Sequence, residues 1–439
     1  MSTQLIICLV IFALTCIGYM TGIWSLGTVA MTSLVALSLT GCLAPSEALA
    51  YFSNNNVIMI GAMSVVAAGF NRTKFCNDLA TAISRLAKGN LSKVLLMYCI
   101  LAMLLSQMVQ SPVVVFGIVA PLCMASAESL GISKTRIALP LGIVAIATCC
   151  TLPIGTGATQ AAELNGYIIS YYDKIPNFAG TMPEVGFFDP MKARLPMLIF
   201  SVLYCAFIMP KFCPEAPSVV TEESSQEKIV ARDELPAFAE VAGIVIFFGV
   251  ALTLMLQANV LKMLQIWQIC MIGAVLMIIC GVLKPKEALQ SIPVSMLLLI
   301  VGALAMAGAL SATGTGDFIG GGIAKIVTVV NNNYIVGLIF FVVPFILTQF
   351  MSNRGAMLIF IPIAIATCYQ NGGDPRGLII LIQAGALTAF MTPMATGAVP
   401  YMMEYGGYDQ KDLLKSGWLF AVLGCIICVG WIMTIMPVL

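Results

Sequence analysis

The most unusual chemistry-bearing residue of this sequence is Arg354, which lies in "FMSNRGAM" at 350–357 between two long apolar runs. A guanidinium at membrane depth costs about 3 kcal/mol or more, so a charge there is a functional hypothesis by default. Its planar fork suits a carboxylate or a sulfate. The sequence leaves two interpretations open. Arg354 is a fixed cation that pairs with an anionic substrate or replaces a bound cation, or it is structural and held by Glu163 or Glu404.

Four short interruptions of apolar segments carry small, polar or proline residues. They lie at 110–112, 152–157, 352–355 and 393–397. Non-helical backbone inside a membrane is tolerated only where it lines protein or a watery cavity. Paired breaks in corresponding places of two halves indicate the substrate site of a secondary transporter. The alternative is that proline and glycine merely kink packed helices. That would explain one isolated break well, but it explains four paired breaks poorly.

The composition defines the setting of these breaks. The chain is 60% hydrophobic and 9% charged, with a mean hydropathy of +1.00, whereas soluble domains carry about 25% charged residues. Apolar stretches of membrane-spanning length recur along the chain, which predicts an all-α polytopic membrane protein. The net charge of +1 offers no case for nucleic acid, and the absence of His excludes Ser-His-Asp triads and zinc-protease motifs. An intramembrane enzyme or a channel remains a remote alternative.

The chain is an internal duplication. "GCLAPSEAL" at 41–49 matches "GVLKPKEAL" at 281–289, and "PIGTGA" at 153–158 matches "PMATGA" at 393–398. Both pairs are separated by 240 positions, and a constant offset over distant segments indicates a repeat.

The duplication predicts a first membrane repeat at 1–211, a cytoplasmic linker at 212–236 and a second repeat at 237–439. Each repeat is expected to contain five transmembrane spans, one re-entrant hairpin and a broken helix. Because five is odd, the second repeat is inverted relative to the first. With the N-terminus outside, most basic residues between the spans fall on the cytoplasmic side, as the positive-inside rule requires. A multi-pass protein of the plasma membrane is therefore expected.

Four segments together resemble the divalent anion/sodium symporter family of the ion transporter superfamily. They are "NNNVIMIGAMSVVAAGFNRT", "SKTRIALPLGIVAIATCCTLPIGTG", "QFMSNRGAMLIFIPIAIA" and "MTPMATG". The resemblance implies inverted repeats, a homodimer and an elevator-type movement that carries di- or tricarboxylates or sulfate. It also implies that the hairpin tips and the broken-helix loops hold sodium and the substrate.

Carried over residue by residue, the resemblance gives the second tip Ser352 and Asn353, with Arg354 where the family has Thr. The first tip keeps Ser111, but Pro112 stands where the family has Asn. The predicted substrate-binding residues are Ser111, Pro112, Thr156, Gly157, Ser352, Asn353, Arg354, Thr396 and Gly397. The predicted ion ligands are Gln110, Ser111, Thr151, Gly155, Ser352, Asn353, Thr392 and Ala395.

These observations predict a secondary active transporter of small anions that is coupled to sodium, with the lipid bilayer as its setting and no cofactor apart from sodium. The alternative is a sodium-independent anion exchanger in which Arg354 acts as a fixed cation. An empty carrier with an unpaired, buried guanidinium would cross the membrane reluctantly, so such a carrier would have to exchange one anion for another.

Overall fold

All regular elements of the described chain are helices. The computed structural model describes residues 3–21, 23–75, 90–109, 111–154, 157–158, 160–172, 182–219, 235–257, 263–313 and 332–438. Within these ranges, five helices are long and apolar enough to cross a membrane by length and composition, and further apolar helices are shorter. This confirms the predicted all-α architecture of a polytopic membrane protein.

The two halves contain similar helices in the same order. The first half has α1 (Thr3–Thr21), α2 (Leu26–Leu39), α3 (Pro45–Ala50), α4 (Asn55–Asn71), α6 (Leu91–Met108), α7 (Pro112–Ser129), α8 (Ala138–Ala147), α9 (Gln160–Tyr172) and α10 (Asp189–Phe207). The second half has α12 (Ala237–Gln257), α13 (Ile266–Ile279), α14 (Pro285–Gln290), α15 (Val294–Ala312), α17 (Asn333–Thr348), α18 (Asn353–Asn371), α19 (Arg376–Leu387), α20 (Ala398–Gly406) and α21 (Gln410–Ile435).

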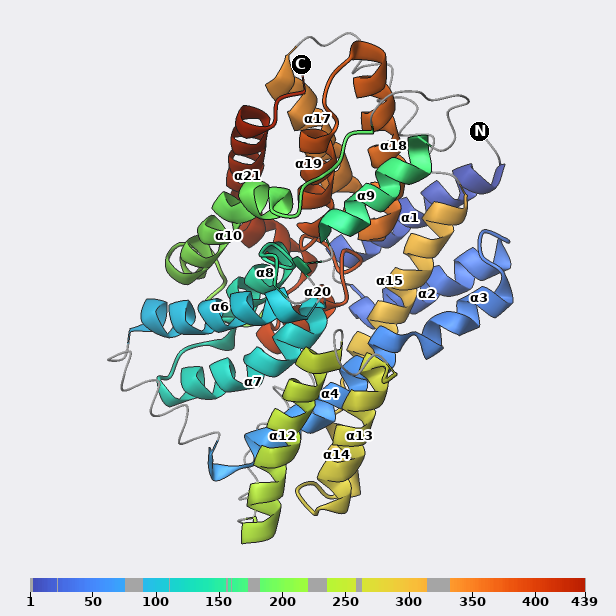
Figure 1. The fold of residues 1–439 in the computed structure, drawn as a ribbon. Helices are drawn as coiled ribbons and strands as arrows, with labels where there is room; N and C mark the ends of the chain where they lie inside the picture. The colour runs from blue at the N-terminus through green and yellow to red at the C-terminus, as the bar shows by residue number, and fades with distance from the viewer. Residues whose placement is uncertain are drawn as a thin grey trace.

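The helices form two bodies, and each half contributes to both (Figure 1). In the first, which we call the scaffold body, α1 to α4 pack with α12 to α15. Its main contacts cross between the halves, because α2 lies along α15 and α4 lies along α13. The α2–α15 approach is close: a Cβ on Gly302 would lie 2.4 Å from the carbonyl oxygen of Ala30.

The second body, which we call the site body, contains α6 to α10 and α17 to α21. Within it, α10 packs against α21, α6 against α8, and α17 against α19. The two bodies meet where α4 packs on α7 and where α15 packs on α20. The described residues of all four predicted breaks lie in the site body.

An ion pair ties the two halves of the scaffold body together. Arg72 Nη1 lies 2.7 Å from Glu287 Oε2 and also donates to the carbonyl oxygen of Val282 at 3.2 Å. The same Glu287 oxygen accepts a hydrogen bond from the backbone N–H of Lys284 at the start of α14. The Arg72 side chain is 10% exposed, so this pair is largely shielded from water.

The first residues of the predicted linker pack on the site body. Thr135 Oγ1 donates to the carbonyl oxygen of Pro214 at 2.6 Å, and Arg136 Nη2 lies 2.6 Å from Glu215 Oε1. The backbone N–H of Ser218 donates to the carbonyl oxygen of Gly407 at 2.8 Å. Residues 220–234 of the linker lie outside the described chain, as do the two predicted site residues Gly155 and Thr156 and the predicted ion ligand Gln110.

Two helices of the site body begin earlier than the hydropathy pattern predicts. In the first half, α10 begins at Asp189, several residues before its long apolar run, and in the second half α21 likewise begins at Gln410, before its own apolar run. A polar first turn explains the second difference, because Asp409 and Asp412 form a capping box at the start of α21. Hydropathy alone does not register such a turn.

Candidate anion-binding site

The second hairpin tip is a short turn between α17 and α18. Ser352 caps α18, since its Oγ accepts a hydrogen bond from the backbone N–H of Gly355 at 3.0 Å. The side-chain oxygen of Asn353 accepts a hydrogen bond from Thr348 Oγ1 at 2.7 Å. Arg354 follows in the first helical turn, and its side chain is 74% exposed. The tip is therefore ordered by its own side chains and presents its guanidinium to solvent.

The position of Arg354 concentrates positive potential at this tip. The N-terminus of a helix carries a partial positive charge, and its first backbone N–H groups have no acceptor within the helix. A cation in the first turn is unfavourable unless an anion lies nearby. The start of α18 thus combines a guanidinium with free N–H groups, which is an arrangement suited to a carboxylate or a sulfate.

Glu163, in the first turn of α9, faces this guanidinium. Its Oε1 lies 4.0 Å from Arg354 Nε, and its side chain is 27% exposed. Its other oxygen lies 3.5 Å from Gln160 Nε2. Exposed ion pairs of this kind contribute about 0–1 kcal/mol. Of the two carboxylates predicted as partners, the structure brings Glu163 to Arg354, whereas Glu404 lies in α20, which packs against α7 and α8.

A buried amide pair joins α9 to the other half. Gln383 Nε2 in α19 donates to Gln160 Oε1 at 2.6 Å, and both side chains are almost fully buried. Gln160 and Glu163 are one turn apart on α9, so this bond fixes the helix that carries the carboxylate. Among the described residues, Gln383 Oε1 is a buried oxygen without a hydrogen-bond partner.

The first hairpin tip lies in an apolar environment. Its Ser111 and Pro112 are half-buried, and the next residue, Val113, adjoins the second broken loop, where a Cβ on Gly397 would lie 3.1 Å from Val113 Cγ2. A narrow enclosed space beside this tip is lined by Met59, Ile60, Met63, Val113, Val114, Leu254, Cys270 and Tyr401. This lining contains no charged side chain, so the described part of the first tip lacks a counterpart to the guanidinium of the second tip.

The first broken loop depends on a glycine. The backbone N–H of Gly157 donates to the carbonyl oxygen of Ile154 at 3.0 Å, and a Cβ on Gly157 would lie 1.9 Å from the carbonyl oxygen of Leu152. No larger residue fits without a shift of the backbone. Thr151, a predicted ion ligand in this loop, donates from Oγ1 to the carbonyl oxygen of Thr148 at 3.1 Å.

The second broken loop uses its hydroxyls locally. Thr392 Oγ1 donates to the carbonyl oxygen of Gln349, and the carbonyl oxygen of Thr392 accepts from the backbone N–H of Ala395 at 3.1 Å. Thr396 Oγ1 accepts a hydrogen bond from the backbone N–H of Ala398 at 3.2 Å, which supports the start of α20. The predicted residues Thr392 and Ala395 are buried, while Thr396 and Gly397 are half-buried.

Sequence reasoning missed a glutamine that clamps the first break. Gln107 Oε1 accepts from the backbone N–H groups of Thr151 and Leu152 at 2.9 and 2.8 Å. Its Nε2 donates to the carbonyl oxygens of Met103 and Thr148 at 2.7 and 2.9 Å. One amide therefore satisfies both the end of α8 and the start of the loop, where backbone groups would otherwise be unpaired.

Gln349 does the same for the second break. Its Oε1 accepts from the backbone N–H of Met391 at 2.8 Å, and its Nε2 donates to the carbonyl oxygens of Phe345 and Thr388 at 2.8 and 3.4 Å. The signal that was available in the sequence is an amide in an otherwise apolar arm shortly before each tip, in "LLSQM" and "ILTQF".

Arg194 is a second residue whose role the sequence did not reveal. It lies inside α10 with 2% of its surface exposed, and its guanidinium donates to the carbonyl oxygens of Ala147 and Cys150 at 3.4 Å each. Both acceptors lie at the C-terminal end of α8, where the helix dipole favours a cation. Arg194 thus stabilises the first break rather than a ligand, in contrast to the exposed Arg354.

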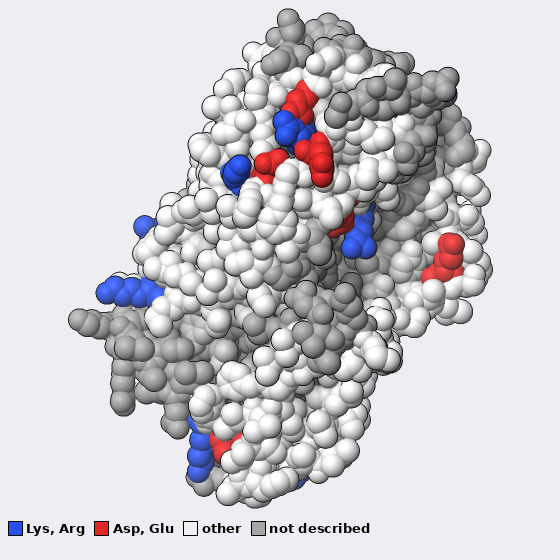
Figure 2. All heavy atoms as spheres, viewed as in Figure 1, with Lys and Arg blue, Asp and Glu red and all other residues white. Residues whose placement is uncertain are grey.

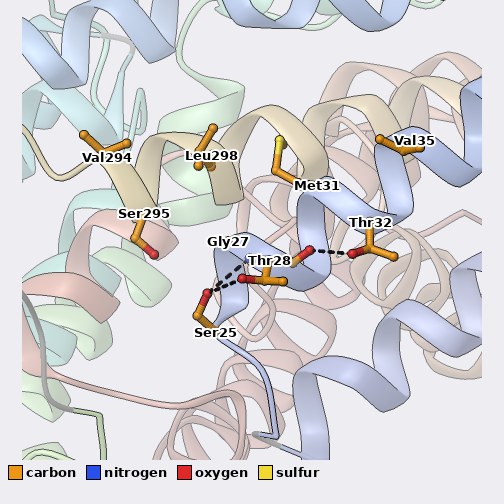
Figure 3. Close-up of a pocket in the computed structure, with 9 residues that line it drawn as sticks. All are labelled: Ser25, Gly27, Thr28, Met31, Thr32, Val35, Val294, Ser295 and Leu298. Carbon is orange, nitrogen blue, oxygen red and sulfur yellow. Dashed lines mark hydrogen bonds between the residues drawn. The ribbon is translucent and has the colours of Figure 1, made fainter.

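A groove of about 600 Å³ lies away from all the predicted residues, between α2 and α15 (Figure 3). Three of its four hydroxyls are already used: Ser25 Oγ lies 2.8 Å from Thr28 Oγ1, and Thr32 Oγ1 donates to the carbonyl oxygen of Thr28. Its remaining lining is mostly apolar and open, and contains no charged side chain. The groove therefore lacks the groups that would bind a polyvalent anion.

Charged side chains are sparse on the surface as well. On the face shown in Figure 2, Lys, Arg, Asp and Glu gather in a few clusters, and most of the other described surface is white. Such a surface is typical of a protein whose sides contact lipid.

Comparison with known proteins defines the class. The sequence model of a family described as "Citrate transporter" matches residues 7–384. The chain therefore belongs to the citrate transporter family, a family of transporters rather than enzymes.

The chain is also similar to several curated transporters. It is 22% identical over 409 residues to an uncharacterized transporter of Haemophilus influenzae, covering 92% of this chain and 85% of the relative. It is 28% identical over 142 residues to the mouse Na(+)/dicarboxylate cotransporter 3, covering 32% and 23%. It is 23% identical over 194 residues to the sodium/sulfate cotransporter 2 of Chlamydomonas reinhardtii, covering 43% and 22%. These matches confirm the resemblance to anion/sodium symporters, although the last two span less than a quarter of the relative's length.

Proposed function

We propose that the protein is a secondary active transporter of small polyvalent anions, namely di- or tricarboxylates or sulfate, and that the second hairpin tip binds the anion. The observation that carries this proposal is Arg354, an exposed guanidinium in the first turn of α18 that faces the broken elements of the other half. Two carboxylates or a sulfate can use both the fork of the guanidinium and the free N–H groups of the helix.

The two halves are proposed to be inverted repeats at 1–211 and 237–439, separated by the cytoplasmic linker at 212–236. The common helix order, the crossed packing of α2 on α15 and of α4 on α13, and the equivalent bonds of Gln107 and Gln349 support this. An elevator-type movement would carry the site body past the scaffold body, whose contacts with it at α4–α7 include the apolar side chains of Met63 and Val113.

Coupling to sodium is proposed because two of the reported relatives are sodium cotransporters. Ser352, Asn353 and Thr392 are the predicted ion ligands of the second half whose side chains carry an oxygen atom. One observation favours the alternative, sodium-independent exchange: the fixed charge of Arg354 adjoins Asn353 and opposes a cation bound at the same tip. The homodimer, the plasma-membrane location and the external N-terminus also remain proposals.

Uptake into proteoliposomes tests the function directly. Labelled succinate, citrate and sulfate would each be offered with and without an inward sodium gradient, and with and without the same anion inside. Saturable uptake driven by sodium supports the symporter, and uptake that requires internal anion but no sodium supports the exchanger. If none of the three anions is taken up under any of these conditions, the proposed function is wrong.

A further inference from the structure

We propose that Glu163 is a built-in counter-anion for Arg354: it takes the place of the substrate's negative charge when the carrier is empty, and so lets the empty carrier return across the membrane. This inference rests on the proposed function, because it assigns the anion to Arg354. It concerns a different step, namely the return of the carrier without cargo.

The geometry of the pair suits a partner that can be displaced. Glu163 Oε1 lies 4.0 Å from Arg354 Nε, which is beyond hydrogen-bond distance, and the guanidinium is 74% exposed. An incoming carboxylate or sulfate can make two parallel hydrogen bonds to the fork and would be the better ligand. The contact with Glu163 is thus close enough to neutralise Arg354 and weak enough to yield to substrate.

A second ion pair in the protein shows the opposite design. Arg72 and Glu287 are in direct hydrogen-bond contact at 2.7 Å, the Arg72 side chain is only 10% exposed, and Glu287 is also used as a helix cap. That pair joins two parts of the scaffold body and has no room for a ligand. Among the ion pairs of the described residues, the contact at Arg354 is the longest, since the others measure 2.6 to 2.7 Å.

Glu163 keeps its place at the start of α9 when an anion displaces its carboxylate from Arg354. It lies in the first turn of α9, where the helix dipole favours a carboxylate. Gln160, one turn earlier, is fixed by its 2.6 Å bond from Gln383 and lies 3.5 Å from the second carboxylate oxygen. Because Glu163 is 27% exposed, the released carboxylate can be hydrated and can return to Arg354 once the anion leaves.

The pair changes the expected mode of transport. Without Glu163, the empty site would carry an unpaired guanidinium, whose passage through the membrane is costly, and the carrier would be confined to exchange. With Glu163, the charges of the empty site cancel and the carrier can return without an anion. The wild-type protein is therefore expected to perform net uptake as well as exchange.

The variant E163Q separates the two modes. In proteoliposomes, net uptake into vesicles without internal anion is expected to fall about 10-fold or more, because return of the empty carrier becomes the slow step. Exchange, measured with the same anion inside, is expected to stay within about 3-fold of wild type, because the loaded carrier does not use Glu163. The apparent affinity for the anion is expected to rise, since a competitor for Arg354 has been removed.

Two comparisons make the result specific. The variant E184Q removes an exposed carboxyl from the segment that follows α9, and it is expected to keep the wild-type ratio of net uptake to exchange. The variant E163D keeps the charge and is expected to retain net uptake to a larger extent than E163Q. A wild-type ratio in E163Q, or an equal loss of both modes in it, would overturn the proposal.

The wild-type protein provides a test that does not depend on the folding of any variant. If wild-type vesicles take up anion only when anion is present inside, the empty carrier does not return and the role assigned to Glu163 is wrong, while the proposed function as an anion carrier stands. If wild-type vesicles show no anion transport of either kind, the proposed function itself fails.

Discussion

The two hairpin tips stand at equivalent places of the duplicated chain, yet their surroundings differ in charge and in access to water. The first tip, at Ser111 and Pro112, adjoins Val113 and Gly397 in an apolar environment. The second tip, at Ser352 and Asn353, is followed by the exposed Arg354 and faces Glu163. One tip is packed among apolar side chains, and the other exposes a guanidinium that we propose binds the anion.

The elements behind the tips do not show this difference. Gln107 and Gln349 clamp the two breaks with the same pattern of hydrogen bonds from one amide. The support of the broken helices has thus been kept in both halves, while the chemistry of the tips has diverged. The comparison teaches that a glutamine supports the broken helix in each half, and that the positive charge near the tips is supplied by the second half.

The largest effect is expected from Arg354→Thr, which removes the only charge of the second tip. A hydrogen bond to a charged group is worth about 1.5–3 kcal/mol, so kcat/KM for anion uptake is expected to fall about 10- to 100-fold. The variant Arg354→Lys keeps the charge but loses the planar fork, and its kcat/KM is expected to lie between those of wild type and Arg354→Thr. Uptake assays in proteoliposomes measure these values. Unchanged transport in Arg354→Thr would contradict the claim that the charge of the second tip distinguishes it from the first.

Two glycine variants compare the loops next to the tips. Gly157→Ala places a Cβ 1.9 Å from the backbone oxygen of Leu152, so the first loop must change its shape, and uptake is expected to fall about 10-fold. Gly397→Ala meets only a methyl group of Val113 at 3.1 Å, which can move aside, and uptake is expected to stay within about 3-fold. Equal effects of the two variants would contradict this account of the loops.

The glutamine clamps are expected to matter for stability in both halves. Gln107→Leu leaves the backbone N–H groups of Thr151 and Leu152 without their acceptor, and unsatisfied buried groups cost about 1–3 kcal/mol each. Gln349→Leu removes one such acceptor, from Met391, and is expected to cost less. Thermal unfolding of the purified variants in detergent measures this difference, and Gln107→Leu is expected to have a lower Tm than Gln349→Leu. The reverse order would contradict the claim that the cost follows the number of backbone N–H groups that each glutamine accepts from.

The smallest effect is expected at the first tip. Ser111→Ala removes a half-buried hydroxyl from an apolar environment, and uptake is expected to remain within about 2-fold of wild type. The matched change at the other tip, Ser352→Ala, removes the cap of α18 and is expected to cost about 1 kcal/mol of stability. A larger loss of transport in Ser111→Ala than in Ser352→Ala would indicate that the anion binds at the first tip, contrary to this account.

Much of this architecture was predictable, because membrane helices and their breaks leave local signals. Apolar length gave the helices to within a few residues, and proline, glycine and hydroxyl residues marked the breaks. The conspicuous position of Arg354 singled out the second tip for the same reason: a charge between two apolar runs needs an explanation.

What the sequence could not supply is which distant groups meet. Gln107 and Arg194 act on carbonyl and N–H groups of a loop some 40 residues away, and backbone partners leave no trace in the residue types. For the same reason, Glu163 and Glu404 were equal candidates for Arg354 until their helices were placed. Only the crossed packing of the two halves, which puts α9 against α18, distinguishes them.

The most direct measurement of the central claim is a structure of the protein at a saturating concentration of whichever anion it transports. The account predicts density for the anion within hydrogen-bond distance of the Arg354 guanidinium, with the Glu163 carboxylate turned away from it. Density beside Pro112 and Gly397, with Arg354 still facing Glu163, would contradict it.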